Sequence, residues 1–268
     1  MIQDKGFDPE RVASRFCRGR IFGIGATVKG FIRNYKAGQP WYKAGPRSAG
    51  NGALMRIAPM VIPHLRSGGT ELWADTALSA MITHNDSASI SACLAFVRIL
   101  WEALRMDNPP DPTWWLDTYV EAAKTLEVKN TYRPRGGAFT DYQGPLWLFV
   151  EEKVRKAHDQ GLSVIEAGRG WFSGAYLLET VPSVIYILMR HGHNLEEAIV
   201  RAVNDTKDND TIAAIVGAAV GALHGKAYIP ERWIRGLSGR TTDCDDGKVF
   251  EIIRDAKDIF WCRNLDRS

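Results

Sequence analysis

Two carboxylates and a hydroxyl stand close together near the C-terminal end of the chain, in Asp208, Asp210 and Thr211. They open the run from Thr211 to His224, which consists almost wholly of small apolar residues. Hard divalent cations prefer carboxylate and hydroxyl oxygens as ligands. A helix this apolar is buried on most of its faces, so its first turn is held rigidly. The three side chains are therefore candidate ligands of a metal ion.

The competing interpretation of this acidic turn is an ordinary helix start. Asp and Thr are common N-cap residues, and the helix dipole favours an acidic side chain in the first turn. For an isolated Asp-x-Asp this is the commoner explanation. The metal-site hypothesis therefore depends on other features of the chain.

A second polar feature is the glycine-rich loop Ala49–Arg56, which precedes a predicted helix. Its Gly-Asn-Gly sequence exposes consecutive backbone N–H groups, and the helix start behind it adds a positive dipole, so it predicts a phosphate cradle. No Gly-Lys-Ser/Thr follows, which excludes a P-loop. The alternative is a simple turn and helix cap.

Histidines offer two further candidates. His84, within Thr83–Asp86, is either a contact to a ligand hydroxyl or phosphate or a hydrogen-bonded loop residue. His191 and His193 have the spacing of a metal pair, but no third ligand lies nearby in the sequence.

Helical periodicity extends through nearly the whole chain, and no series of alternating strands appears. With no repeat and no linker, we predict one all-α domain over residues 1–268. Pro182 should kink or restart its helix. Gly217, Gly221 and Gly225 should allow close packing against a neighbouring helix, because glycine is otherwise costly in a helix. Predicted helices cover 9–17, 23–35, 71–81, 86–106, 111–126, 162–168, 174–190 and 195–203, with short pieces in 55–65, a surface loop over 129–145 and a last helix capped by 243–247.

The composition, 45% hydrophobic and 24% charged, is typical of a soluble globular protein. A net charge of +3 without any long single-sign block gives no reason to expect a nucleic-acid partner. No stretch has the length of a membrane span or the pattern of a signal peptide, so no membrane partner is expected. The cysteines form no Cys-x-x-Cys pair, which predicts reduced thiols in a cytoplasmic protein; they are Cys17, Cys93, Cys244 and Cys262.

Four features, in order, make the chain similar to the ADP-ribosylglycohydrolase family, which includes the dinitrogenase-reductase-activating glycohydrolases and the J1 crystallins. Ser48–Pro59 resembles the family's phosphate-cradling loop, and Thr83-His84 resembles its Thr-His pair. Glu179–Pro182 resembles the helix ahead of its metal motif. The stretch from Val203 to Trp233 resembles its C-terminal signature.

The resemblance implies a compact helical fold that holds two Mg²⁺ or Mn²⁺ ions. It also implies hydrolysis of the glycosidic bond that joins ADP-ribose to a modified protein side chain or a related acceptor. The partner would be an ADP-ribosylated protein or a small molecule containing ADP-ribose. The metals would orient the ribose and activate a water. By this resemblance Asp208, Asp210 and Thr211 are metal ligands, His84 lies near ADP-ribose, and the diphosphate is held by Asn51, Gly52, Ala53, Leu54 and Met55; no catalytic residue is assigned.

Three departures from the family pattern bear on activity. The family's N-terminal segment, with a catalytic acid and an Asp-Asp metal cluster, would precede Phe7, so the domain is expected to be N-terminally incomplete. Gly23-Ile24-Gly25 stands where many members have Asp-Ile-Gly. Thr206-Lys207 replaces a Gly-Gly pair, and a lysine ammonium would compete with a cation unless its long stem carries it outward. The alternative function is therefore an inactive member that binds ADP-ribose or has a structural, crystallin-like role.

Overall fold

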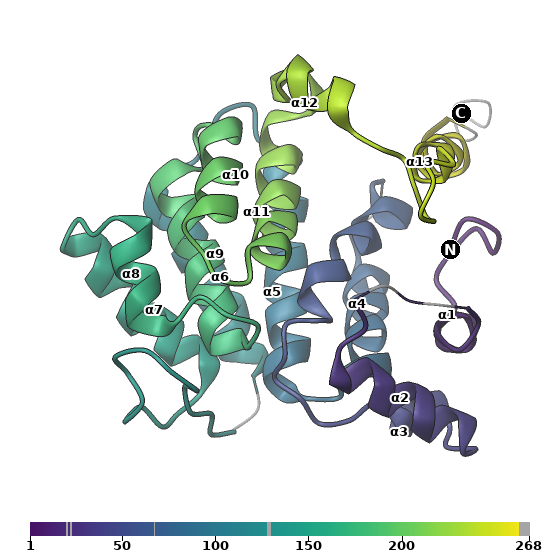
Figure 1. The fold of residues 1–268 in the computed structure, drawn as a ribbon, viewed down its shortest axis with the longest axis horizontal. Helices are drawn as coiled ribbons and strands as arrows, with labels where there is room; N and C mark the ends of the chain where they lie inside the picture. Colours follow the sequence, from purple (N-terminus) through teal and green to yellow (C-terminus); the bar gives the residue numbers. More distant parts are fainter. Residues whose placement is uncertain (20, 22, 67, 128–129, 263–268) are drawn as a thin grey trace.

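The fold is helical throughout the part of the chain that the computed structural model describes, which is every residue except 20, 22, 67, 128–129 and 263–268 and the side chain of 262. These residues form no strand (Figure 1). Two isolated bridges, Gly50 with Tyr176 and Tyr132 with Gly144, are the β-type pairings among them. The all-α prediction is confirmed.

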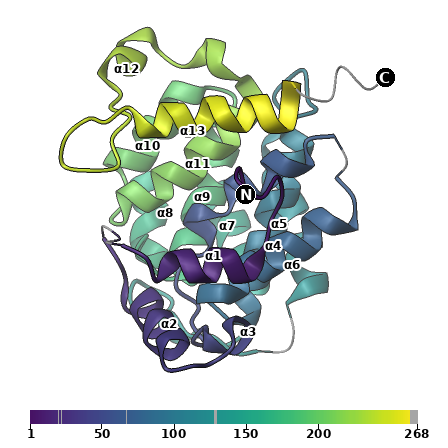
Figure 2. The same cartoon turned by 90° about the vertical axis from the view of Figure 1, so that its right-hand side faces the viewer.

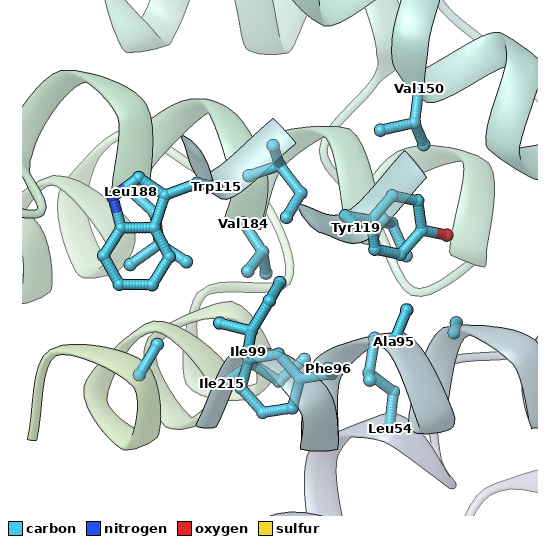
Figure 3. Close-up of a cluster of buried hydrophobic side chains, with 14 of the residues drawn as sticks. Leu54, Ala95, Phe96, Ile99, Trp115, Tyr119, Val150, Val184, Leu188 and Ile215 are labelled. Carbon is cyan, nitrogen blue, oxygen red and sulfur yellow. The ribbon is translucent and has the colours of Figure 1, made fainter. Parts of the chain in front are cut away.

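Helix α9, Leu177–His191, lies at the centre of the core, and its residues from Leu177 to Met189 are all buried. Figure 3 shows how side chains from different helices meet in this core, with Val184 and Leu188 of α9 close to Trp115 and Ile99. The helices packed against α9 are α5 (Ser87–Ala103), α6 (Pro112–Leu126), α7 (Leu146–Asp159), α8 (Val164–Trp171), α10 (Leu195–Asn204) and α11 (Asn209–His224).

Pro182 lies inside α9 without dividing it, so the prediction that the helix restarts there is wrong. A proline in a helix interior costs roughly 3 kcal/mol or more. Fully burying one large apolar side chain contributes about 1.5–3 kcal/mol. Several such side chains flank Pro182, Val181 and Val184 among them, and their burial outweighs the local cost.

Most predicted helices form within a few residues of their expected bounds. Residues 146–159, to which the periodicity assigned no element, form α7. The short pieces predicted in 55–65 are confirmed and are 3₁₀ helices, η1 (Leu54–Arg56) and η2 (Ala58–His64). The remaining elements are α1 (Pro9–Phe16), α2 (Ala26–Lys36), α3 (Trp41–Ala44), α4 (Thr70–Thr83), η3 (Lys226–Tyr228), α12 (Glu231–Gly236), α13 (Lys248–Lys257) and the π-helical turn η4 (Asp258–Cys262).

Two smaller parts lie on one side of this core. Helices α1 to α3 and the end of α4 bury a second cluster, Ala13, Phe31, Ala44 and Ile82. Helix α13 stands apart from α10 and α11, on the same side as α1 (Figure 1; Figure 2). Among the described residues, no helix combines the length and hydropathy that crossing a membrane requires.

The glycine face of α11 has no close neighbour in the described chain, contrary to the expected close packing. A Cβ added at Gly217 would meet only Ile199, at 3.8 Å, and one added at Gly221 would meet nothing within 4 Å. Gly225 ends the helix with a positive φ of 75°. The cost of a helical glycine at position 221 is therefore not offset by any contact among the described residues.

Replacing Gly221 by alanine should raise the free energy of unfolding by about 0.5–1 kcal/mol, because alanine loses less backbone entropy and has open space here. Urea denaturation would measure the change. The control variant Gly225→Ala should instead destabilise the protein, because its positive φ disfavours any side chain. A loss of stability in Gly221→Ala would mean that this face is covered in solution.

Candidate functional site

The side chain of Asn51 brings the glycine loop and the acidic turn of α11 together. Its amide Nδ2 donates to Asp208 Oδ2 at 2.6 Å and to Thr180 Oγ1 at 2.8 Å. Thr180 lies in the buried first turn of α9, and its Oγ1 in turn donates to the carbonyl of Gly174, before the helix, at 2.7 Å. Two groups predicted separately from the sequence, the loop and the acidic turn, thus form one site.

Asp208 occupies the N-cap position of α11, but its side chain does not cap the helix. One carboxylate oxygen accepts the Asn51 amide, and the other has no hydrogen bond to the described residues. Asp210 is exposed, and its Oδ1 accepts the backbone N–H of Thr211 at 2.8 Å. The helix-cap interpretation therefore does not account for Asp208.

The donor atoms of this turn fit a hard divalent cation in type. Asp208 and Asp210 offer carboxylate oxygens, and Thr211 offers a hydroxyl that donates only a long, weak hydrogen bond, to Met55 Sδ at 4.0 Å, among the described residues. Mg²⁺ keeps several waters and is often bound through one or two carboxylates. Among the described residues, no three or more His, Cys, Asp or Glu side chains gather into a metal-binding group. Two carboxylates and one hydroxyl match the ligand types of such an ion but are few for a pair of ions.

Two strained residues fix the backbone of the acidic turn. Phe172 and Ser173 have φ values of 77° and 41°, which are rare for residues other than glycine and cost of order 1–3 kcal/mol each. This bend directs the Ser173 carbonyl at two backbone donors, the N–H groups of Lys207 at 3.2 Å and Asp208 at 3.1 Å. Nothing in the sequence marks either residue, because neither is of a type that favours positive φ.

Lys207 points away from the acidic turn. Its Nζ lies 3.3 Å from the ring centroid of Phe172, where the ring face attracts the ammonium. It forms no ion pair with Asp208 or Asp210 in the described structure. The contact with the Phe172 ring accounts for the position of the ammonium without a carboxylate partner among the described residues.

A buried ion pair borders the site. Arg135 Nε and Nη2 donate to the two carboxylate oxygens of Glu179 at 3.0 and 2.8 Å. The Glu179 side chain is 0% exposed, whereas that of Arg135 is 55% exposed and lies over the Tyr176 ring. Hydrogen bonding to Glu179 raises the pKa of Arg135, and the negative charge of Asp208 adds to the effect. In the sequence, Glu179 is recognisable only as part of the Glu179–Pro182 motif, and no pattern there indicates Arg135.

The glycine loop is held from both sides. The Asn51 N–H donates to the Ala175 carbonyl at 3.3 Å, and the Leu177 N–H donates to the Ala49 carbonyl at 2.9 Å. Leu54 is buried in the core beneath the loop (Figure 3). The loop is thus fixed in place before any ligand binds.

Only part of the predicted phosphate cradle is free. The N–H groups of Asn51 and Met55 already donate within the chain, whereas those of Gly52 and Ala53 donate to no described residue. The expected dipole of an α-helix behind the loop is also absent, because only the three-residue η1 follows. Met55, predicted to hold phosphate, is 47% exposed at the rim, and Leu54 faces the core.

His84 packs directly on this loop. A Cβ added to Gly52 would lie 2.9 Å from His84 Cε1, so only glycine fits there. The ring is 2% exposed, and Nδ1 lies 2.9 Å from Thr83 Oγ1. Burial, and next the charge of Arg56, lower the pKa of His84 to about 4. The imidazole is therefore neutral at neutral pH.

A cavity of about 490 Å³ is bordered by Arg47, which shortly precedes the loop in sequence, and by Asn85, which follows His84. The Asn85 N–H donates to the Pro46 carbonyl at 3.0 Å, which joins the two segments that line the cavity. Tyr132 closes one side and donates to Asp86 Oδ1 at 2.9 Å. The lining residues are Arg47, Asn85, Asp86, Ser87, Asn130, Thr131 and Tyr132.

A family model described as ADP-ribosylglycohydrolase matches residues 1–259 of the chain. A solved structure named as an ADP-ribosylglycohydrolase-related protein complex aligns with a TM-score of 0.65 and 24% identity, covering 97% of this chain and 75% of that one. At this identity the structural likeness concerns the fold alone.

Curated relatives are similar over most of this chain. An uncharacterized protein from Archaeoglobus fulgidus is 31% identical over 246 residues, 87% of this chain and 70% of that protein. ADP-ribosylarginine hydrolase Tri1 from Pseudomonas putida is 27% identical over 82% of this chain, which spans only 51% of Tri1. ADP-ribosylhydrolase ARH3 from Xenopus tropicalis is 26% identical over all of this chain and 80% of ARH3.

The buried neutral His84 should make stability depend on pH. Its pKa of about 4 in the folded protein lies below the ordinary 6.5, so the unfolded chain binds the extra proton between these values. The stabilising contribution is complete above pH 6.5 and is lost as the pH falls toward 4. Between pH 7 and pH 5 the wild type should lose about 2 kcal/mol more than His84→Gln, as measured by urea denaturation. Equal pH dependence in His84→Gln and in the exposed-site variant His193→Gln would contradict this.

Removing Arg135 should lower the free energy of unfolding, because the buried Glu179 carboxylate loses its charged partner. Arg135→Met should destabilise the protein by about 2 kcal/mol, because Glu179 then lacks its charged partner, although the exposure of Arg135 tempers the effect. Arg133→Met, which removes only a bond to the exposed Gln143, should change stability by no more than about 0.5 kcal/mol. Thermal or urea unfolding measures both. If adding Glu179→Gln to Arg135→Met restores no stability, the pair is not coupled as described.

Proposed function

Since this chain belongs to the ADP-ribosylglycohydrolase family, we propose that it binds ADP-ribose and hydrolyses the bond joining ADP-ribose to a modified side chain or a related acceptor. The observation that carries the proposal is the bond from Asn51 to Asp208, which joins an anion-binding loop to an acidic turn. A molecule that carries both a diphosphate and a ribose diol has one group for each. The acceptor, whether arginine, serine or another side chain, is left open.

The loop side suits the diphosphate. The unpaired N–H groups of Gly52 and Ala53, with the ring of His84 beside them, offer neutral donors to phosphate oxygens. The guanidinium of Arg56 lies behind the loop and has no carboxylate partner among the described residues. Its positive charge takes the place of the helix dipole that the sequence predicted. The neighbouring cavity, about 490 Å³, has room for the nucleoside.

The acidic side suits the distal ribose and a divalent cation. Asp208, Asp210 and Thr211 would hold Mg²⁺ or Mn²⁺, and a bound metal would supply orientation of the ribose hydroxyls and polarisation of a water. Asn51 fixes the orientation of the Asp208 carboxylate, and Ser173 fixes its backbone. These contacts prepare the carboxylate to bind without rearrangement.

Two ions would need more ligands than Asp208, Asp210 and Thr211 provide. The described residues offer no group of three or more metal-binding His, Cys, Asp or Glu side chains. The chain also spans about half the length of the Tri1 relatives and 80% of ARH3. The same observation favours one alternative function, binding of ADP-ribose without turnover.

Calorimetry with ADP-ribose tests the loop. Gly52→Val should weaken binding at least about tenfold, because the new side chain would meet His84 and displace the loop. Gly6→Val, where an added Cβ meets no atom within 4 Å, is the matched control and should bind like the wild type. Unchanged affinity in Gly52→Val would remove the loop from the binding site.

Release of ADP-ribose from modified proteins, with Mg²⁺ or Mn²⁺ present, tests catalysis. Where the wild type releases ADP-ribose, we expect the rate of release to be at least about a hundredfold lower in Asp208→Asn, because one proposed metal-binding carboxylate is lost. If the chain binds free ADP-ribose but releases none from proteins modified on arginine or on serine, the binding-only alternative is favoured. Release that is unaffected by Asp208→Asn would refute the assignment of the acidic turn.

A further inference from the structure

We propose that Arg56 is a positioning residue that acts through the hydroxyl of Thr83 on His84. It fixes His84 as the tautomer with its proton on Nε2, and this N–H faces the glycine loop. The proposal rests on a chain of hydrogen bonds that starts and ends at the loop: Arg56 is the last residue of the loop segment, and His84 packs on the loop in space.

The guanidinium of Arg56 lies against the last turns of α4. Nη1 donates to Ser79 Oγ at 3.1 Å, and Nη2 donates to the Ser79 carbonyl at 2.9 Å and to Thr83 Oγ1 at 2.7 Å. Its Nε is buried and has no hydrogen-bond partner in the described structure. The ring of Phe16 lies 5.2 Å from Cζ. Arg56 is thus held by hydroxyls and a carbonyl rather than by a carboxylate.

Counting protons along this chain determines the tautomer. A guanidinium can only donate, so Thr83 Oγ1 accepts from Arg56 and must place its own proton elsewhere. Thr83 is 0% exposed, and the acceptor in reach is His84 Nδ1 at 2.9 Å. If Nδ1 carried the proton instead, the buried hydroxyl would have no acceptor, which is unfavourable. The hydroxyl therefore donates to Nδ1, and the ring proton is on Nε2.

Nε2 faces the loop. A Cβ added to Gly52 would lie 3.1 Å from Nε2, and one added to Gly50 would lie 3.5 Å from it. Nε2 has no hydrogen bond to a described residue, so its N–H is available to an acceptor oxygen above the loop. The lowered pKa of His84, about 4, agrees with a neutral ring. The step from a free N–H to a bond with a phosphate or ribose oxygen rests on the function proposed above.

Arginine suits this role better than lysine. Its planar fork reaches Ser79 and Thr83, one helical turn apart, at the same time. A lysine ammonium at this position would keep the charge but could not hold both hydroxyls in the same fixed geometry.

The tautomer can be read in the ligand-free protein by long-range ¹H–¹⁵N NMR of the histidine rings at neutral pH, with His84 assigned by its loss in His84→Gln. The wild type should show a protonated Nε2 and an unprotonated, hydrogen-bonded Nδ1. Thr83→Val should shift the Nδ1 signal and admit the other tautomer, and Thr83→Ser should restore the wild-type spectrum. Arg56→Lys should also perturb Nδ1.

Thr76→Val is a matched control, because Thr76 lies on the same helix, is 0% exposed and has a hydroxyl without a described partner. It should leave the His84 signals unchanged, and thermal melts should confirm that every variant is folded. A proton on Nδ1 in the wild type, or His84 signals that are the same in Thr83→Val, would overturn the proposal. Signals unchanged in Arg56→Lys and Arg56→Met would overturn the part assigned to Arg56.

Titration with ADP-ribose tests the ligand step separately. Affinity should fall about tenfold in Thr83→Val, as expected for one weakened hydrogen bond to an anion, and should recover in Thr83→Ser. The expected NMR result combined with unchanged affinity would overturn the ligand step. If the wild type binds no ADP-ribose at all, the proposed function fails, while the NMR result still decides the tautomer.

Discussion

The hydrogen bonds of the Asn51 amide are the constraint on which the site depends. They join Asn51 to Thr180 in α9, which lies 129 positions later in the sequence, and to Asp208 before α11, which lies 157 positions later. The amide has two N–H donors, and this arrangement uses both on buried or half-buried oxygens. Because α9 is the buried central helix of the core, the loop and the acidic turn are both anchored to the core through Thr180.

Two cationic side chains near the site are stabilised in different ways. Arg135 forms a bidentate pair with the fully buried Glu179, so the charge of each is largely offset. Arg56 has only hydroxyl and carbonyl partners in the described chain, so its positive charge is not offset. The uncompensated charge lies behind the loop proposed to receive a diphosphate, where a positive potential stabilises an anion.

Close approach explains why small residues surround the site. A Cβ on Gly174 would lie 2.5 Å from Glu179 Oε2, and a Cβ on Gly52 would meet the His84 ring. The neighbouring Phe172 and Ser173 hold strained backbone so that one carbonyl serves the turn before α11. Such strain persists only where surrounding packing enforces it, and it often marks a functional region.

The helical class, most helix positions and the three separate polar segments at Asn51, His84 and Asp208 can be predicted from the amino-acid sequence. Hydrophobic periodicity and local turn chemistry depend on neighbours in the chain, and both can be read without a structure. The resemblance to a family supplied the expected roles, and the family was confirmed.

How these segments meet depends on the folding of distant parts of the chain. The Arg135–Glu179 pair, the Asn51–Asp208 bond and the direction of the Lys207 stem depend on contacts between distant segments, which local patterns do not contain. The uninterrupted helix through Pro182 has the same origin, since burial in the core outweighs a local preference. The proton on His84 follows from Arg56 and Thr83, because His84 Nδ1 is the one acceptor of the Thr83 hydroxyl among the described residues.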